Sequence, residues 1–209
     1  MNPTGPIRIL SVDDHPMLRE GIAAVLASEQ DIVLVAEASN GREAVEQFRI
    51  HRPDVTLMDV QMPEVNGIDA IAKIREEFPE ARIIVLTTYT GDAQAARAFK
   101  AGAAGYLLKN MVRKELIDTI RTVHSGKKKI PAEIAVEMAQ HHSDDALTER
   151  EIQVLREVAA GNANKMVAQL LRVSEETVKA HMKSILSKLG ANDRTHAVTI
   201  AVKRGIIEI

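Results

Sequence analysis

The feature that most constrains this chain is a fivefold alternation of short apolar runs and helical patterns over residues 7–124. Each run has the length of a buried strand, and apolar residues at helical spacing follow it. The expected strands are 7–12, 32–38, 55–59, 83–87 and 105–108. Strict alternation implies a parallel sheet with helices on both faces and right-handed crossovers. We therefore predict an α/β fold with a doubly wound five-stranded parallel sheet of order 2-1-3-4-5.

The second half of the chain follows a different pattern. Residues 125–131 break the alternation, and a short helix around 132–140 leads to an exposed joint that holds His141 and His142. From Leu147 onward the pattern is helical throughout, with capping signals before the first, third and fourth helices. The expected helices are one after a capping box of Thr148 and Glu151 that ends near Gly161, a short one over 164–171, one capped by Ser174 that ends at Leu189, and one capped by Asn192 or Asp193. We predict a first domain at 1–124, a linker with a short helix at 125–145, and an all-α four-helix domain at 146–209.

Charge also divides the chain. Residues 1–124 carry 14 Lys and Arg against 18 Asp and Glu, whereas residues 146–209 carry 10 against 7. An acidic front and a mildly basic back indicate two domains with different partners. The absence of cysteine excludes disulfides and thiolate metal sites. The N-terminus lacks an apolar signal region and no apolar run is long enough to span a membrane, so we expect a cytoplasmic protein.

Polar side chains stand at the ends of four expected strands. Asp13 and Asp14 follow the first, Asp59 ends the third, Thr87 ends the fourth, and Lys109 follows the fifth. Open α/β sheets bind ligands at this edge, so the joint placement indicates a site. A carboxylate there can accept a phosphoryl group if a hard cation such as Mg²⁺ balances the charge, and clustered carboxylates favour such a cation. Taken singly, Asp13 and Asp14 are better read as helix caps, Thr87 as a strand end and Lys109 as a surface lysine.

These residues belong to longer motifs, and with them residues 7–124 resemble the receiver domain of two-component response regulators, which has a flavodoxin-like strand order. The matching segments are Val12-Asp13-Asp14-His15, Leu57-Met58-Asp59-Val60-Gln61-Met62-Pro63, Gly67, Leu86-Thr87 and residues 101–109. The resemblance implies that Asp59 is the phosphoacceptor, that Asp13 and Asp14 serve Mg²⁺, and that the backbone carbonyl of Gln61 is a further ligand. It also implies that Thr87 swings toward the phosphoryl group and that Tyr106 follows it inward.

Two further residues of this region, His15 and Asn110, are interpreted separately. His15 is interpreted as a loop residue in preference to a metal ligand. Asn110 stands where many receivers have a proline after a cis bond, and a cis bond before a non-proline residue costs about 3 kcal/mol. The geometry of the Lys109–Asn110 bond is therefore open at this stage.

The expected helices 164–171 and 174–189 have helix-turn-helix spacing. Val178, Met182, Ile185 and Leu189 form an apolar stripe, opposite Ala180, Lys183, Ser184 and Ser187. Lysines and hydroxyls suit insertion into the major groove of DNA, although this face alone fits a protein-binding module equally well.

Residues 147–204 resemble the LuxR-type helix-turn-helix of NarL/FixJ-family response regulators. The resemblance rests on Leu147-Thr-Glu-Arg-Glu151, Gly161, Asn164-Lys165, Ala168, Val173-Ser174, Thr177-Val178-Lys179, His181, Leu186, Lys188-Leu189 and Asp193-Arg194-Thr195. It implies that Lys179, Ala180 and Lys183 reach base edges. It also implies phosphate contacts for Asn164, Lys165, Ser174, Thr177 and Lys188, and a dimer contact for residues 193–204.

The sequence thus predicts a DNA-binding transcriptional regulator that a sensor histidine kinase switches by phosphorylating Asp59. We expect a homodimer on double-stranded DNA or in the phosphorylated state, and no membrane partner. Two alternatives remain. The first is a Mg²⁺-dependent aspartyl-phosphate phosphatase, but such enzymes typically keep an acid two residues after the nucleophile, where this chain has Gln61. The second is a receiver that acts through protein contacts without DNA. We expect no enzyme activity beyond slow loss of the phosphoryl group.

Overall fold

The computed structural model describes residues 5–63, 65–88, 91–140 and 146–207. The pair His141 and His142 lies outside these ranges. The chain divides into two compact units, residues 1–88 with 96–132 and residues 89–95 with 133–209. No helix in the described ranges is both long and apolar enough to cross a membrane.

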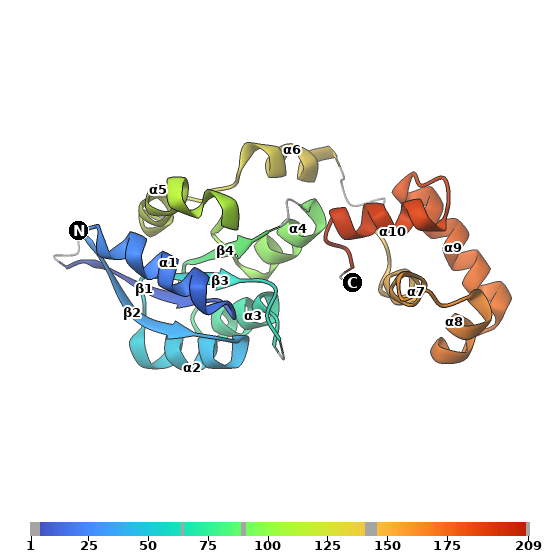
Figure 1. Ribbon diagram of the computed structural model, residues 1–209, viewed down its shortest axis with the longest axis horizontal. Helices are drawn as coiled ribbons and strands as arrows, with labels where there is room; N and C mark the ends of the chain where they lie inside the picture. The colour runs from blue at the N-terminus through green and yellow to red at the C-terminus, as the bar shows by residue number, and fades with distance from the viewer. Residues whose placement is uncertain (1–4, 64, 89–90, 141–145, 208–209) are drawn as a thin grey trace. The chain divides into compact units, whose positions relative to one another are not determined.

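The first unit contains the predicted sheet (Figure 1). Its strands are β1 (Ile7–Val12), β2 (Ile32–Ala38), β3 (Val55–Asp59), β4 (Ile83–Thr87) and β5 (Gly105–Leu108). They pair in parallel in the order β2-β1-β3-β4-β5, which confirms the predicted topology. Because β1 and β3 are neighbours although β2 lies between them in sequence, the switch point falls where Asp13 and Asp59 leave the sheet.

Helices cover both faces of this sheet. They are α1 (Pro16–Ala27), α2 (Gly41–His51), α3 (Gly67–Glu77), α4 (Asp92–Ala101) and α5 (Val112–His124), with a 3₁₀ turn, η1 (Lys109–Met111), before α5. Side chains alternate along a strand, so neighbouring residues enter different layers. Ile9 and Leu57 join the core beneath α1 and α5, whereas their neighbours Leu10 and Met58 are equally buried but lie outside that cluster. The aliphatic composition thus supplies two apolar layers around one sheet.

The outer edge of β5 is paired by the chain that follows α5. Lys129 forms an isolated parallel bridge with Gly105. The Tyr106 backbone N–H donates to the Lys129 carbonyl at 3.0 Å, and the Lys129 N–H donates to the Ala104 carbonyl at 3.0 Å. The Lys129 ammonium also lies 2.8 Å from Asp118 Oδ2 on α5. Residues just beyond the predicted end of the first domain therefore continue the sheet.

The described residues of the second unit from 133 onward form helices and the turns between them. Its helices are α6 (Ala132–Gln140), α7 (Glu149–Ala159), α8 (Asn164–Leu171), α9 (Glu175–Leu189) and α10 (Arg194–Lys203). Thr148 and Glu151 form the predicted capping box of α7. Ser174 caps α9, and Gly190 ends that helix in the left-handed conformation at φ 59°. The predicted stripe of Val178, Met182, Ile185 and Leu189 is buried in the core of this unit.

Candidate functional site

Asp59 lies at the carboxyl end of β3 with 1% of its surface exposed. The loop after it folds back tightly, because the Gly67 N–H donates to the Val60 carbonyl at 3.1 Å. A Cβ on Gly67 would lie 1.9 Å from the Asp59 carbonyl oxygen, so only glycine fits at this position. Asn66 then caps α3 by accepting from the Asp69 N–H. The nucleophile predicted from sequence is therefore fixed at the backbone by the start of α3.

Asp13 and Asp14 follow β1 in a loop that is tied to the start of α1. Asp13 is fully buried, and its Oδ1 accepts the His15 backbone N–H at 2.8 Å. The Arg19 guanidinium, one turn into α1, donates to the Asp13 carbonyl at 2.6 Å. Pro16 occupies the first turn of α1, where its missing N–H and fixed φ suit a helix start. The Asp13 carboxylate is thus held in place by α1 at the edge of the sheet.

Lys109 brings the end of β5 to the same place. Its Nζ lies 2.8 Å from Asp13 Oδ2 and 2.7 Å from Asp59 Oδ2, and its side chain is 13% exposed. The structure therefore joins three of the strand-end residues that the sequence singled out. Every peptide bond described is trans, which includes the Lys109–Asn110 bond left open by the sequence.

The protonation of Asp59 reflects this environment. Burial raises the pKa of Asp59 to about 6, with a further increase from the Asp13 charge, while the Lys109 ammonium opposes the shift. Burial acts in the other direction on Lys109, but the two carboxylates outweigh it and raise the pKa of that ammonium. A carboxyl group with a pKa of about 6 is ionised in roughly nine tenths of molecules at pH 7. Asp59 can therefore act as an anionic nucleophile near neutrality.

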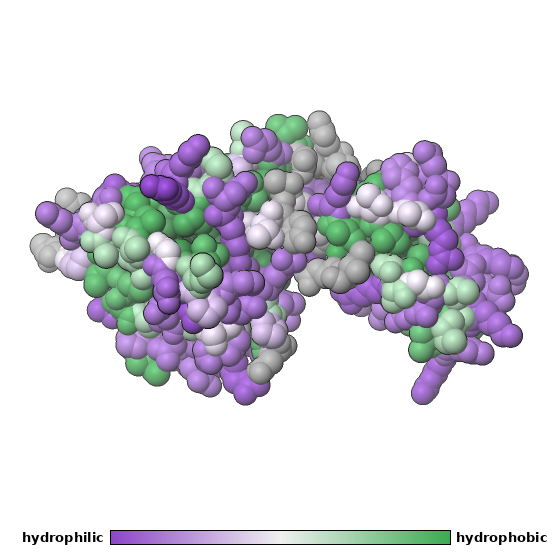
Figure 2. All heavy atoms as spheres, viewed as in Figure 1, coloured by the Kyte–Doolittle hydropathy of each residue, from purple (hydrophilic) through white to green (hydrophobic). Residues whose placement is uncertain are grey.

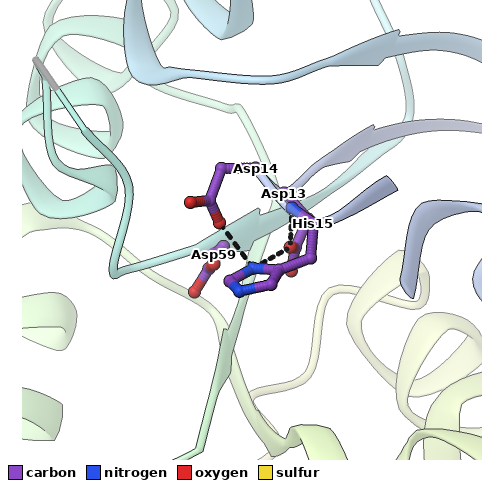
Figure 3. Close-up of side chains that lie close together, drawn as sticks. All are labelled: Asp13, Asp14, His15 and Asp59. Atoms are coloured by element: carbon purple, nitrogen blue, oxygen red, sulfur yellow. Dashed lines mark hydrogen bonds and ion pairs between the residues drawn. The ribbon is translucent and has the colours of Figure 1, made fainter. Parts of the chain in front are cut away.

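The acidic side chains also form a cluster that fits a divalent cation. Asp13, Asp14, His15 and Asp59 each offer one atom, and these atoms all lie within 4.8 Å of one another (Figure 3). Asp13 Oδ2 and Asp14 Oδ1 are buried and accept no hydrogen bond among the described residues, although Lys109 and His15 lie at ion-pair distance from them. Buried carboxylate oxygens with spare lone pairs are suited to a hard cation such as Mg²⁺.

The Gln61 backbone lies beside the Asp59 carboxylate. Its N–H donates to Asp59 Oδ1 at 3.1 Å. This bond holds one Asp59 oxygen toward the loop, while the other faces Lys109. A role for the Gln61 carbonyl as a metal ligand stays a prediction.

Thr87 and Tyr106 form the remaining part of the predicted site. Each is only 1% exposed, and their side chains are hydrogen-bonded to each other. Burial raises the pKa of Tyr106 to about 12, and its ring lies 6.3 Å from that of Phe99. The Tyr106 ring is therefore already buried in the first unit before any movement of Thr87 toward Asp59.

Sequence reasoning missed two contributors to this site. Gly67 entered the sequence analysis only as part of a receiver motif, but its contact with the Asp59 carbonyl depends on how the loop folds back. His15 lies in the loop before α1, as predicted, and its Nδ1 also lies 2.7 Å from Asp14 Oδ1 and 3.2 Å from Asp13 Oδ1. The only sequence signal for His15 was its position directly after two acidic residues.

The helix-turn-helix consists of α8 and α9, and hydrophilic residues dominate the face of this unit that Figure 2 shows. Most of the residues predicted to contact DNA are accessible. Lys165, Ser174, Lys179, Ala180 and Lys183 are exposed, and Asn164, Thr177 and Lys188 are partly buried. Lys179 pairs with Glu176 on its own helix at 2.8 Å, and Ser174 Oγ lies 2.8 Å from Thr177 Oγ1. Lys183 has no ion pair within the described ranges, so its charge is free for another partner.

Glu151 on α7 binds two residues of α9, and one of them, Lys188, is a predicted phosphate contact. Its carboxylate accepts from the Ser184 hydroxyl at 2.6 Å and from the Lys188 ammonium at 2.8 Å. It also accepts the Thr148 N–H that completes the capping box, at 2.7 Å. Burial opposes ionisation, but Lys188 and the other donors outweigh it and lower the pKa of Glu151 to about 2. Ser184 therefore faces this network, whereas the sequence placed it opposite the apolar stripe.

Comparison with known proteins assigns a family to both halves. Residues 9–121 match the response regulator receiver domain, and residues 145–201 match the luxR family of bacterial regulatory proteins. The chain is 36% identical over 216 residues to the transcriptional regulatory protein LnrK of Bacillus subtilis, with 96% of this chain and 98% of LnrK covered. It is 35% identical over 207 residues to the response regulator protein VraR of Staphylococcus aureus, with 97% and 99% covered.

A solved structure shares the arrangement of elements. RcsB of Salmonella enterica serovar Typhimurium, bound to a promoter in the presence of the phosphomimetic BeF₃⁻, matches with a TM-score of 0.73 and 25% identity. The match covers 95% of this chain and 99% of the RcsB chain. This chain therefore belongs to the family of DNA-binding transcriptional response regulators that join a receiver domain to a LuxR-type helix-turn-helix.

Proposed function

We propose that Asp59 accepts a phosphoryl group from the phosphohistidine of a sensor histidine kinase, and that the phosphorylated chain regulates transcription from DNA in the cytoplasm. The observation that carries this proposal is the meeting of Asp13, Asp59 and Lys109 at one edge of the sheet, with Nζ–O distances of 2.8 and 2.7 Å. A buried carboxylate next to a cation and to further carboxylates is suited to phosphoryl transfer, because that reaction needs positioning and charge balance above all.

In the transfer step an Asp59 carboxylate oxygen attacks phosphorus. A new O–P bond forms, the P–N bond to the histidine breaks, and its electron pair leaves with the imidazole. Lys109 then has a phosphoryl oxygen to pair with, and the Thr87 hydroxyl can donate to another. Mg²⁺, held by Asp13, Asp14, Asp59 and the Gln61 carbonyl, would neutralise charge on the phosphoryl oxygens.

Gln61 favours retention of the phosphoryl group over its rapid release. A neutral amide at this position cannot deliver the proton that a carboxylic acid would supply to a leaving group. Asp59 is therefore suited to hold a phosphoryl group as a signal, and we assign no catalytic residue. The family's role as a DNA-binding regulator agrees with this reading.

The DNA-binding part of the proposal concerns α9. Lys179, Ala180 and Lys183 would contact base edges, and Asn164, Lys165, Ser174, Thr177 and Lys188 would lie near phosphates. Two copies bound through α10 would read two related half-sites. The exposure of Ala180 and Lys183 supports this assignment. Phosphorylation adds up to about two negative charges at Asp59, and rearrangement of Thr87 and Tyr106 would pass this change to α4, β5 and α5.

Replacement of Asp59 by Asn tests the assignment. Labelling of the purified chain by radioactive acetyl phosphate with Mg²⁺ should be abolished in Asp59→Asn, because the amide is not a nucleophile of comparable strength. Asp69→Asn is the matched control, since Asp69 is an exposed carboxylate of the same unit. It should label like the parent chain. Sedimentation should show dimers in the labelled parent but not in Asp59→Asn. Persistent labelling of Asp59→Asn would place the phosphoacceptor elsewhere.

A further inference from the structure

We infer that His15 is a further protein ligand of the cation site beside its three carboxylates, so that this receiver binds divalent transition-metal ions through an imidazole nitrogen as well as through carboxylates. The inference rests on the proposed function, because it concerns the same cation site. It states which metal ions this site binds, whereas the proposed function states which residue accepts the phosphoryl group.

The distances around His15 match one coordination shell. Adjacent ligands of an octahedral ion with bonds of about 2.1 Å lie about 3.0 Å apart, and opposite ligands about 4.2 Å apart. His15 Nδ1 lies 2.7 Å from Asp14 Oδ1 and 3.2 Å from Asp13 Oδ1. All four ligand atoms, with Asp59 included, lie within 4.8 Å of one another. Figure 3 shows the His15 ring lying among the three carboxylates. The four groups can therefore contact a single ion with small adjustments.

The chain holds the imidazole there by local means. Pro16 restricts the residue before it to extended conformations, and His15 has φ −92° and ψ 108°. The His15 N–H is bound to Asp13 Oδ1, so the backbone beside the ring is fixed on the cluster itself. The His15 side chain is 69% exposed, so its ring is accessible to an incoming ion.

Chemistry then selects the metal. An all-oxygen site suits Mg²⁺, whereas imidazole nitrogen favours ions such as Co²⁺ and Ni²⁺, which also bind more tightly in the general order of divalent metals. Asp13 Oδ2 and Asp14 Oδ1 lie 2.8 Å from the Lys109 ammonium and 2.7 Å from His15 Nδ1, and each carboxylate oxygen keeps a further lone pair for the same ion. We expect Mg²⁺ and transition-metal ions to share the three carboxylates, with His15 adding affinity only for the latter.

The variant His15→Asn separates ligation from folding. Asparagine is a good helix N-cap, so α1 should start normally, and its side chain lacks an imidazole nitrogen. The measurements use the untagged full-length chain with His141→Asn and His142→Asn as background, because that pair could bind metal independently. Calorimetric titration should show Co²⁺ affinity reduced at least about tenfold by His15→Asn. Mg²⁺ affinity should change by less than about twofold. His124→Asn, a histidine elsewhere in the same unit, is the matched control and should change neither.

Electron spin-echo spectra of Mn²⁺ bound to the parent chain give a direct readout. They should contain ¹⁴N coupling from imidazole, and His15→Asn should remove it. Unchanged Co²⁺ affinity in His15→Asn, or absence of nitrogen coupling in the parent chain, would overturn the inference and leave His15 as a positioning residue for Asp14. Asp59 of the parent chain should be labelled by acetyl phosphate with Mg²⁺. Absence of labelling in the parent chain would contradict the proposed function of Asp59 and would not affect the assignment of His15 as a metal ligand.

Discussion

The geometry around Asp59 depends on the absence of a side chain at Gly67. A Cβ there would lie 1.9 Å from the Asp59 carbonyl oxygen and 3.0 Å from Val60 Cα, and both are backbone atoms that cannot turn away. Gly67→Ala must therefore move the β3–α3 loop, which also carries Gln61. The position of Asp59 and the stability of the fold are thus coupled at this residue.

We expect Gly67→Ala to lower the free energy of unfolding by about 3 kcal/mol, as overpacking against backbone does. It should also slow labelling of Asp59 by acetyl phosphate. Urea denaturation and the labelling rate check the two effects. Gly21→Ala is the control, because Gly21 lies within α1 and a Cβ there meets nothing within 4 Å. That variant should be neutral or stabilising by up to about 1 kcal/mol. Equal behaviour of the two variants would contradict the role of Gly67.

Glu151 gives the second unit a defined dependence on pH. Its pKa falls from an ordinary 4.5 to about 2 in the folded chain. The stabilisation from its ionised form is present above pH 4.5 and is lost as the pH falls toward 2, since the unfolded chain then binds the proton more tightly. The shift corresponds to at most about 3 kcal/mol.

We therefore expect Glu151→Gln to remove most of the loss of stability between pH 5 and pH 3. Hydrogen exchange of the α7 and α9 amides at these two pH values measures the effect within the full chain. Glu175→Gln, an exposed position in the first turn of α9, should keep the loss seen in the parent. The same loss in Glu151→Gln as in the parent chain would show that other groups control the acid sensitivity.

The sequence predicted single residues well where the signal was local. Asp13, Asp59 and Lys109 each follow an apolar run, so a parallel sheet brings them together once its strand order is known. The contact of Gly67 with Asp59 and the place of His15 depend on how loops fold back. Neither follows from spacing along the chain. Ser184 was misplaced for the same reason, because its partner Glu151 lies on another helix.

At the scale of elements, α9 carries the DNA-binding prediction. Its apolar stripe is buried in the unit's core, which leaves Ala180 and Lys183 on the exposed side. Glu151 holds this helix through Ser184 and Lys188, so its orientation is fixed at two points. A rigid element of this kind presents its lysines in a defined direction.

We expect Lys183→Ala to weaken binding to an operator by about 1–3 kcal/mol if the side chain reaches a base, and to flatten the salt dependence if it neutralises a phosphate. Fluorescence anisotropy at several salt concentrations measures both. Lys73→Ala, which removes an exposed lysine from α3, should leave affinity and salt slope unchanged. Acetyl phosphate labelling should be unaffected in both variants. Unchanged DNA affinity in Lys183→Ala would mean that another face binds DNA.

Element boundaries followed from periodicity with few exceptions. All five strands have the predicted bounds, because each apolar run is flanked by turn residues. The 3₁₀ turn at Lys109–Met111 was not predicted, since a single turn leaves no repeating apolar pattern. The predicted last helix, 193–204, is one residue shorter at each end, because Asp193 serves as its N-cap and Arg204 as its C-cap.

At the scale of the whole molecule, charge and pattern both indicated two halves. The two family matches, over residues 9–121 and 145–201, leave a stretch between them that neither covers. The predicted boundary after residue 124 came from the break in the β–α alternation. Composition could not reveal that residues just beyond it pair with β5, because a single bridging residue carries no apolar period.

The bridge between Lys129 and Gly105 bears on where this chain can be shortened. An unpaired strand at the edge of a sheet offers its N–H and C=O groups to other chains and promotes self-association. Here the Tyr106 N–H and the Ala104 carbonyl on that edge are already occupied by Lys129. A receiver that ended at residue 124 would leave both groups open, with the Ile84 and Val123 side chains close behind. A receiver that ended at residue 132 would keep both groups occupied, so a difference of eight residues decides whether Lys129 protects this part of the β5 edge.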